Sequence, residues 1–200
     1  MNIDILPIGM YGENSYVVHE KNEVLLIDPG AYPKEILKRI RPEEKVDAIV
    51  LTHGHEDHTG AVDDIVDVLH CPVYLHPDDF LLVAHDNGRD VRAFARPVYS
   101  DITPLGDTLD TGVFHLKIYH TPGHTPGSVC IQYKDALFSG DTLFAGSVGR
   151  TDLPGGSEKE MIASLRFLRT LPGYLKVFPG HGDATTINIE DSNNPFMAMI

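Results

Sequence analysis

Short runs of apolar residues, each closed by Gly, Pro, Asn or charged residues, begin the chain and predict adjacent β-strands. Three such runs stand near the N-terminus, at residues 2–8, 14–20 and 23–30. Residues 32–41 differ, because their apolar positions are three and four apart, which is the spacing of a helix face. A continuous apolar strand is predicted over 46–52. The helical spacing then returns over 61–69 and stops before Pro72.

The second half repeats this plan. Apolar runs predict strands at 114–124, 128–133, 136–141 and 174–182. A helix is predicted over 157–171, because Ser157 and Glu160 have the spacing of a capping box ahead of an apolar stripe. Strands followed by helices in both halves indicate two sheets between outer helices, which is an α+β architecture. The chain contains no linker or low-complexity segment, so we expect one domain over residues 1–200.

Histidine and aspartate cluster where the predicted strands end. The stretch LTHGHEDHTG, residues 51–60, contains three of the chain's eleven histidines and follows the apolar strand at 46–52. Three more strands end on residues of the same kind, namely His124, Asp141 and His181. Loops at strand ends are held by the sheet while their tips stay exposed, so function often lies there. Five imidazoles and two carboxylates exceed one tetrahedral zinc site and suit two metal ions that share one carboxylate.

The other histidines lack this placement. We expect His19, His70, His85 and His115 at the surface or at helix ends, and His76 and His120 as no more than supporting residues near the site.

Composition narrows the classes of partner. The formal charge of −13 disfavours nucleic acid, because no Lys/Arg run offsets it. No apolar run approaches the length of a membrane span, and the first ten residues contain no basic leader, so we expect a cytoplasmic protein. The two cysteines, Cys71 and Cys130, have no metal-type spacing and are expected to be buried thiols. The oligomeric state stays open.

Four motifs, in order, carry a resemblance to a known family. They are THGHEDH at 52–58, TPGHTPGS at 121–128, SGDTLF at 139–144 and PGHG at 179–182. In these motifs the chain resembles the metallo-β-lactamase superfamily, and within it the short glyoxalase II-like hydrolases. The resemblance implies an αββα four-layer sandwich of two mixed sheets flanked by helices. It also implies one metal on His53, His55 and His124, a second on Asp57, His58 and His181, and Asp141 between them.

The resemblance implies hydrolysis of a small thioester of the hydroxyacyl-glutathione type, such as S-lactoylglutathione. Two divalent ions, zinc with iron or manganese as alternatives, would hold a shared hydroxide that attacks the thioester carbonyl. Asp57 would act as the catalytic residue that orients this hydroxide. The zinc β-lactamases commonly place a cysteine in the second metal site and are exported, and neither feature is found here, so antibiotic hydrolysis is not the expected main role.

Full-length glyoxalase II continues into a helical region that helps to bind glutathione, and this chain resembles it only up to about His181. Its glutathione-contacting segment carries Lys and Tyr, where this chain has Arg150 and Asp152. Arg150 is therefore a candidate substrate-binding residue, with an Arg150–Asp152 ion pair as the structural alternative. The sequence GRTD at 149–152 also resembles the persulfide dioxygenases, which use one iron, and this is the alternative enzyme class. A metal-binding protein without catalysis is the third possibility.

Overall fold

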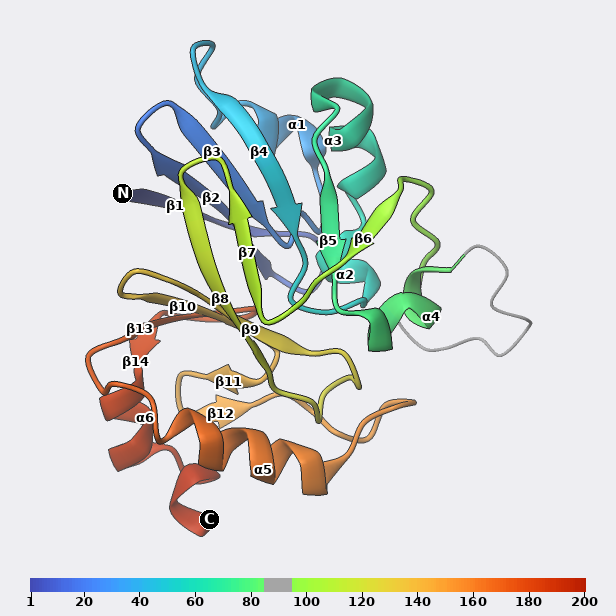
Figure 1. Cartoon of the computed structure of the whole chain (residues 1–200). Helices are drawn as coiled ribbons and strands as arrows, with labels where there is room; N and C mark the ends of the chain where they lie inside the picture. The colour runs from blue at the N-terminus through green and yellow to red at the C-terminus, as the bar shows by residue number, and fades with distance from the viewer. Residues whose placement is uncertain (85–94) are drawn as a thin grey trace.

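Six strands from the first half of the chain form one mixed sheet in the order β1-β2-β3-β4-β5-β6 (Figure 1). The pairs within β1 to β3 are antiparallel, whereas β3 to β6 run parallel. We use a computed structural model, which describes residues 1–84 and 95–200. The strands of this sheet are β1 (Asn2–Ile8), β2 (Glu13–Glu20), β3 (Glu23–Ile27), β4 (Lys45–Val50), β5 (Val73–Leu75) and β6 (Ile102–Pro104).

A second mixed sheet has the order β14-β13-β10-β9-β8-β7. Only β10 and β13 run parallel, and the other neighbours are antiparallel. Its strands are β7 (Thr108–Thr111), β8 (Phe114–His120), β9 (Val129–Tyr133), β10 (Ala136–Gly140), β13 (Lys176–Pro179) and β14 (Thr185–Thr186). A separate two-stranded hairpin, β11 (Leu143–Phe144) and β12 (Ser147–Val148), follows β10.

The α-helices are α1 (Pro33–Leu37), α2 (Glu56–Thr59), α3 (Val62–Leu69), α4 (Phe80–Val83), α5 (Glu158–Leu168) and α6 (Ile187–Asn193). Helices α1 and α3 lie on the outer face of the first sheet, and α5 and α6 lie on the outer face of the second (Figure 1). The 3₁₀ turns are η1 (Pro77–Asp79) and η2 (Met197–Met199). Among the helices of the described ranges, 1–84 and 95–200, none has both the length and the apolar character that crossing a bilayer requires.

Three apolar cores separate four layers, because central strands bury both of their faces. On β3, Val24 and Leu26 pack toward α1 and α3, while Leu25 and Ile27 pack toward the second sheet. On β10, Phe138 faces the first sheet, and the third core joins the opposite face of the second sheet to α5 and α6. Neighbouring residues of a strand point to opposite faces, so a continuous apolar run places side chains in two cores at once. The structure confirms the predicted αββα sandwich of mixed sheets.

The predicted elements are found close to their expected bounds, and the differences have local causes. The Ser157 hydroxyl accepts a hydrogen bond from the Glu160 amide at 3.3 Å, and α5 begins directly after it. The helix predicted over 32–41 is only Pro33–Leu37, because the residues beyond Leu37 continue as turns with bonds such as Arg39 N–H to the Ile36 carbonyl. Strands β5, β6, β7 and β14, the β11–β12 hairpin, and helices α4 and α6 were not predicted from the sequence.

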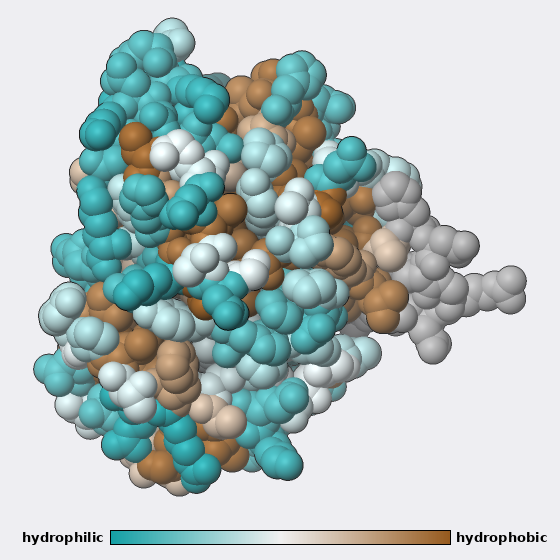
Figure 2. All heavy atoms as spheres, in the orientation of Figure 1, coloured by the Kyte–Doolittle hydropathy of each residue, from teal (hydrophilic) through white to brown (hydrophobic). Residues whose placement is uncertain are grey.

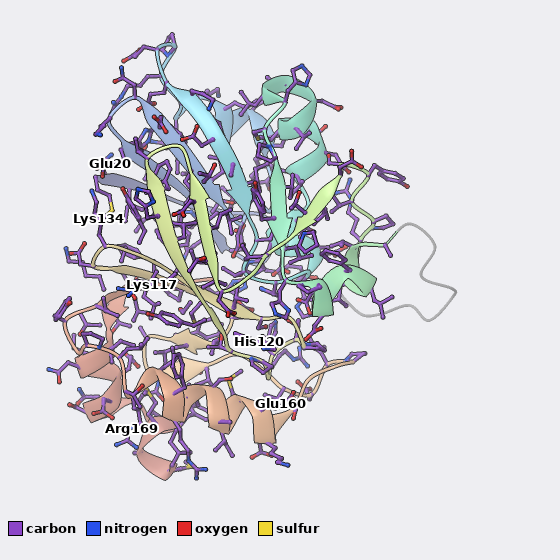
Figure 3. All side chains as sticks on the ribbon, viewed as in Figure 1. Glu20, Lys117, His120, Lys134, Glu160 and Arg169 are labelled. Carbon is purple, nitrogen blue, oxygen red and sulfur yellow. The ribbon has the colours of Figure 1, made fainter. Side chains whose placement is uncertain are left out.

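An ion pair fastens the two sheets together at one edge. Lys134, in the turn between β9 and β10, contacts the Glu20 carboxylate at the end of β2 (Figure 3). The N-terminal amine lies 3.4 Å from the same carboxylate. Both partners are partly exposed, so the pair adds little stability by itself, and the apolar core between the sheets supplies most of it.

Replacing Phe138 with Ala tests the importance of the core between the sheets. Phe138 is fully buried, and its ring lies 5.0 Å from that of Tyr16 on the opposite sheet. We expect Phe138→Ala to lower the free energy of unfolding by about 3–5 kcal/mol, because it removes a large apolar side chain and leaves a cavity. Tyr174, which is 71% exposed, is the control, and Tyr174→Ala should change stability by about 0.5 kcal/mol or less. Denaturant unfolding measures both. A Phe138→Ala loss below about 1 kcal/mol would contradict this description.

Candidate metal centre

Four strand ends converge on one site at the edge of the two sheets. His53 and His55 lie in the loop after β4, and Asp57 and His58 lie on the following short helix α2. The second sheet contributes the others, which are His124 between β8 and β9, Asp141 directly after β10, and His181 after β13. The structure thus brings together all seven residues that the sequence motifs indicated.

Three histidines form a first group. Potential ligand atoms of His53, His55 and His124 all lie within 4.8 Å of one another. The three side chains are buried, and His55 Nδ1 is 2.9 Å from His124 Nε2. Two imidazole nitrogens at this distance cannot both be lone-pair acceptors, so either a proton or a cation must lie between them.

A carboxylate and two histidines form a second group. Ligand atoms of Asp57, His58 and His181 also lie within 4.8 Å of one another. Asp57 Oδ2 is 3.4 Å from His181 Nε2 and 3.8 Å from His58 Nε2. His58 is fully buried, whereas Asp57 and His181 are partly exposed and reach the surface of a cavity.

The carboxylate of Asp141 lies between the two groups. Its Oδ2 is 3.4 Å from His124 Nε2 of the first group and 3.6 Å from His181 Nε2 of the second. Its Oδ1 is 3.4 Å from His58 Nε2. Burial acts to raise the pKa of Asp141, but the nearby His58, His124 and His181 outweigh it and lower that pKa, so the group is ionised.

The arrangement fits two divalent cations. Among the described residues, buried atoms without a hydrogen-bonding partner include His53 Nε2, His58 Nε2 and Asp141 Oδ1. Such atoms are costly in an interior, and their clustering is explained if cations take their lone pairs. The residues that could hold one cation are His53, His55 and His124, and those that could hold another are Asp57, His58 and His181, with Asp141 between. Imidazole and carboxylate ligands accept zinc, iron and manganese alike.

Hydrogen bonds on the outer side orient three of the rings. His58 Nδ1 is 2.9 Å from Asp28 Oδ2, and His124 Nδ1 is 2.7 Å from the Arg150 carbonyl. His53 Nδ1 is 3.1 Å from Thr52 Oγ1, whose own hydrogen is directed to Asp28 at 2.6 Å. Each Nδ1–H therefore donates outward, which leaves Nε2 with its lone pair facing the centre.

Two buried aspartates that the sequence analysis missed support the loops. Asp28 accepts from the Thr52 amide at 2.7 Å as well as from His58, so it connects the end of β3 with both histidine groups. Asp79, at the end of η1, accepts from the amides of Gly54 at 2.9 Å and Gly127 at 2.6 Å. The DPG at 28–30 was a visible signal, since a strand ended there on a carboxylate, but Asp79 carried no signal in the local sequence.

Asp79 ties together the two loops that hold the first histidine group. Besides the two amides, it accepts from Thr125 Oγ1 at 2.7 Å. Gly54 stands between His53 and His55, and Thr125 follows His124, so one carboxylate fixes both loops. Burial raises the pKa of Asp79, while its three hydrogen bonds oppose that shift.

Glycine is required where the last strand end approaches the centre. A Cβ atom on Gly180 would lie 2.1 Å from Asp141 Oδ1 and 2.8 Å from the His58 ring, so any side chain would displace the site. Asn14 holds the same loop from the first sheet, donating to the carbonyls of Pro179 at 3.0 Å and Gly182 at 2.8 Å. These contacts place His181 beside residues of the first sheet.

The site forms one wall of a cavity of about 370 Å³, which we call the metal cavity. It is lined by His55, Asp57, His124, Asp141 and His181 together with Tyr11, Phe144, Val148, Arg150 and Leu153. Arg150 therefore reaches the cavity. Its guanidinium forms the ion pair that was the structural alternative, with Nε 2.7 Å and Nη2 2.8 Å from the two Asp152 oxygens.

The remaining histidines lie elsewhere. His70 ends α3 and His115 is exposed, as predicted, whereas His85 lies outside the described residues. The expectation for His19 was wrong, because this side chain is 5% exposed and its Nδ1 is 2.9 Å from Glu44 Oε1. His76 and His120 stack on each other with ring centroids 4.2 Å apart. Cys71 and Cys130 are free and buried, as expected.

Comparison with known proteins identifies the family. The family model described as "Metallo-beta-lactamase superfamily" matches residues 8–181, so the chain belongs to that superfamily. The chain is 39% identical to "Probable metallo-hydrolase YqgX" of Bacillus subtilis, covering 96% of this chain and 95% of that one. It is 31% identical to "Hydroxyacylglutathione hydrolase GloC" of Haemophilus influenzae, covering 98% of both.

Solved structures show the same fold. TTHA1623, solved in a di-iron-bound form, is 40% identical with a TM-score of 0.84 and covers 96% of this chain and 99% of that one. The BLEG-1 B3 metallo-β-lactamase is 35% identical with a TM-score of 0.86 and covers 98% and 99%.

Acid should release metal from the second group before the first. Burial, followed by the neighbouring histidines, lowers the pKa of His53 and lowers that of His55 to about 4, so these rings are neutral at pH 7. For His58 and His181 burial also lowers the pKa, but nearby carboxylates outweigh it and raise the pKa above the ordinary value. A proton therefore competes with the metal more strongly at His58 and His181 than at His53 and His55 as pH falls from 8 to 6.

The measurement is metal content after dialysis over that pH range. We expect one equivalent to leave first, and His181→Ala protein to retain only the acid-resistant equivalent. Loss of both equivalents in a single step, or retention of the acid-sensitive one by His181→Ala, would show that the two groups do not differ in this way.

Asp79→Asn should weaken metal binding at the first histidine group. The amide side chain of this variant has an NH₂ group in place of one carboxylate oxygen, and this group cannot accept a hydrogen bond from a backbone N–H. The loops of His55 and His124 therefore lose part of the hydrogen bonding that joins them. We expect affinity at this group to fall by about 10–100-fold, the range found for residues that support metal ligands. Asp78→Asn, on the same turn but exposed, is the matched control. Metal titration under competition with a chelator measures both, and equal affinities in the two variants would refute the role of Asp79.

Proposed function

We propose that the protein is a metal-dependent hydrolase that cleaves small thioesters of the hydroxyacyl-glutathione type, such as S-lactoylglutathione. One observation carries the proposal: Asp141 lies within 3.4–3.6 Å of histidines from both groups, on the wall of an open cavity. Two divalent ions held by these groups would supply a hydroxide at neutral pH and a Lewis acid for a carbonyl oxygen.

The protein's own residues then position the reactants. Asp57 is partly exposed to the cavity. Burial acts to raise the pKa of Asp57, but the hydrogen bond from His181 and the charge of His58 outweigh it and hold the carboxylate ionised. As a carboxylate it accepts a hydrogen bond from water and so fixes the direction of the oxygen lone pair. Tyr11 and Phe144 also line the cavity and offer aromatic surface beside the reacting carbonyl.

A thioester suits this site because a thiolate leaves without strong general-acid assistance. The cavity lining named above includes no Lys and no Cys, and its histidines belong to the two groups already described. The GloC relative, named as a hydroxyacylglutathione hydrolase, supports this substrate class at 31% identity. The Arg150 guanidinium would share its N–H groups between Asp152 and a carboxylate of the thiol carrier.

Hydrolysis of β-lactams is a second candidate activity, favoured by one observation. The BLEG-1 B3 metallo-β-lactamase is 35% identical over nearly the whole chain. The attack on a lactam carbonyl needs the same ligand groups, but its leaving group is an amine that requires a proton. Persulfide dioxygenation stays the alternative that the GRTD sequence raised, and it would use one iron instead of two ions.

The test measures S-lactoylglutathione hydrolysis, oxygen uptake with glutathione persulfide, and hydrolysis of a chromogenic cephalosporin, all on one metal-replete preparation. We expect thioester hydrolysis to dominate, and Asp141→Ala to lower its kcat/KM on the order of 100-fold or more, because both metal groups lose a shared ligand. Asp110→Ala, which removes an exposed carboxylate paired with His115, is the matched control and should keep full activity. Persulfide-dependent oxygen uptake without thioester turnover would instead establish the dioxygenase.

A further inference from the structure

A second cavity of about 440 Å³ adjoins the metal cavity, and we call it the apolar groove. Val148 and Arg150 line both cavities, so both border the end of β12 and the residues directly after it. The side chains that make the groove apolar are Val148, Met161, Ile162, Leu165, Phe196 and Met199. Its volume is in the range of sites that bind small molecules, which are also mostly apolar.

The groove has a buried floor and an open apolar lip. Met161 and Leu165, on α5, are 3% and 2% exposed, whereas Phe196 and Met199 near the C-terminus are 43% and 79% exposed. Hydrophobic side chains reach the surface at the lower end of the molecule, where α5 and the C-terminal segment lie (Figures 1 and 2). Exposed apolar side chains around a hollow mark a surface that gains free energy when an apolar ligand covers it.

Arg169 fixes the wall that the C-terminal segment contributes. It stands directly after α5 (Figure 3), and its Nε is 2.6 Å from Asp191 Oδ1 on α6. Its Nη1 donates to the Ile200 carbonyl at 2.7 Å. One guanidinium thus joins α5, α6 and the end of the chain, which keeps η2 beside α5 and the groove in shape.

We propose that the apolar groove binds the acyl chain of the substrate, so that acyl thioesters with longer apolar chains are favoured over short ones. This inference rests on the proposed thioester hydrolysis. A carbonyl held at the metal cavity lies next to the groove, because Val148 and Arg150 border both. In this proposal the acyl chain leaves the reacting carbon beside Val148 and Arg150 and enters the groove.

Charge argues for the acyl chain over the thiol carrier. The Arg150 guanidinium is already paired with Asp152, and Glu158 adds a negative charge to the lining. Inside the groove the carboxylates of glutathione would meet the charge of Glu158 and would lose hydration against apolar walls, so a contact between a carrier carboxylate and Arg150 is made from the metal cavity, which Arg150 also lines. The carrier is expected to remain over the open mouth of the metal cavity, while the groove takes the part of the substrate that water solvates poorly.

The experiment is a chain-length series of N-acetylcysteamine thioesters, acetyl, butyryl, hexanoyl and octanoyl, with zinc-loaded protein. This thiol is small and uncharged, so the acyl chain is the only variable. We expect kcat/KM to rise about two- to fourfold for each methylene that enters the groove, which is the ratio expected for burying a methylene. Ile162→Gln, which makes the groove wall polar at similar volume, should flatten this rise, so that the ratio of octanoyl to acetyl kcat/KM falls toward 1.

Ile189→Gln is the matched control, because Ile189 is 50% exposed on α6 and does not line the groove. It should keep the full dependence on chain length. Acetyl turnover with no rise along the series, or a rise that Ile162→Gln leaves intact, would overturn the groove assignment and leave the proposed hydrolase standing.

If neither these thioesters nor S-lactoylglutathione is cleaved, the proposed hydrolysis fails, and binding of octanoate decides the groove separately. Titration calorimetry should then show octanoate binding that Ile162→Gln weakens and Ile189→Gln does not. No octanoate binding would overturn the groove as an apolar-chain site.

Discussion

The position of the Asp141 carboxylate between two groups of metal-ligand side chains is the constraint on which the site depends. A carboxylate that touches histidines on both sides requires β10, β4 and β13 to end at one place. Those strands belong to two different sheets, so the packing of one sheet on the other sets the geometry of the site. Buried atoms that lack hydrogen bonds, such as His53 Nε2, are explained if cations complete the two groups.

The sandwich keeps this arrangement rigid. Apolar cores on both faces of the central strands fix the strand ends, and buried aspartates fix the loops that follow. Asp28 and Asp79 each accept three hydrogen bonds, and each joins segments distant in the sequence. Histidine rings that these hydrogen bonds already orient need little rearrangement when a ligand binds. The conformational entropy of ordering them is lost when the protein folds. Stability and function therefore depend on the same few buried polar contacts.

The sequence predicted the layers and the ligand set because both produce local patterns. Apolar runs mark the central strands, and His53 to His58 stand within six consecutive positions. Asp79 was missed since its partners, Gly54 and Gly127, are 25 and 48 positions away and only the fold brings them together. His19 was misplaced for a similar reason, because Glu44 covers it from another segment. Short strands such as β5 and β11 contain too few residues to show a period. The apolar groove also has no counterpart in the sequence motifs, because Ile162, Phe196 and Val148 come from separate segments.

Two metal ions that share the Asp141 carboxylate are the central claim, and a crystal structure of the metal-loaded protein tests it most directly. We predict two anomalous-scattering peaks about 3.5–4 Å apart, with Asp141 in contact with both. A single fully occupied peak, or two peaks of which one lies away from Asp141, would contradict the account.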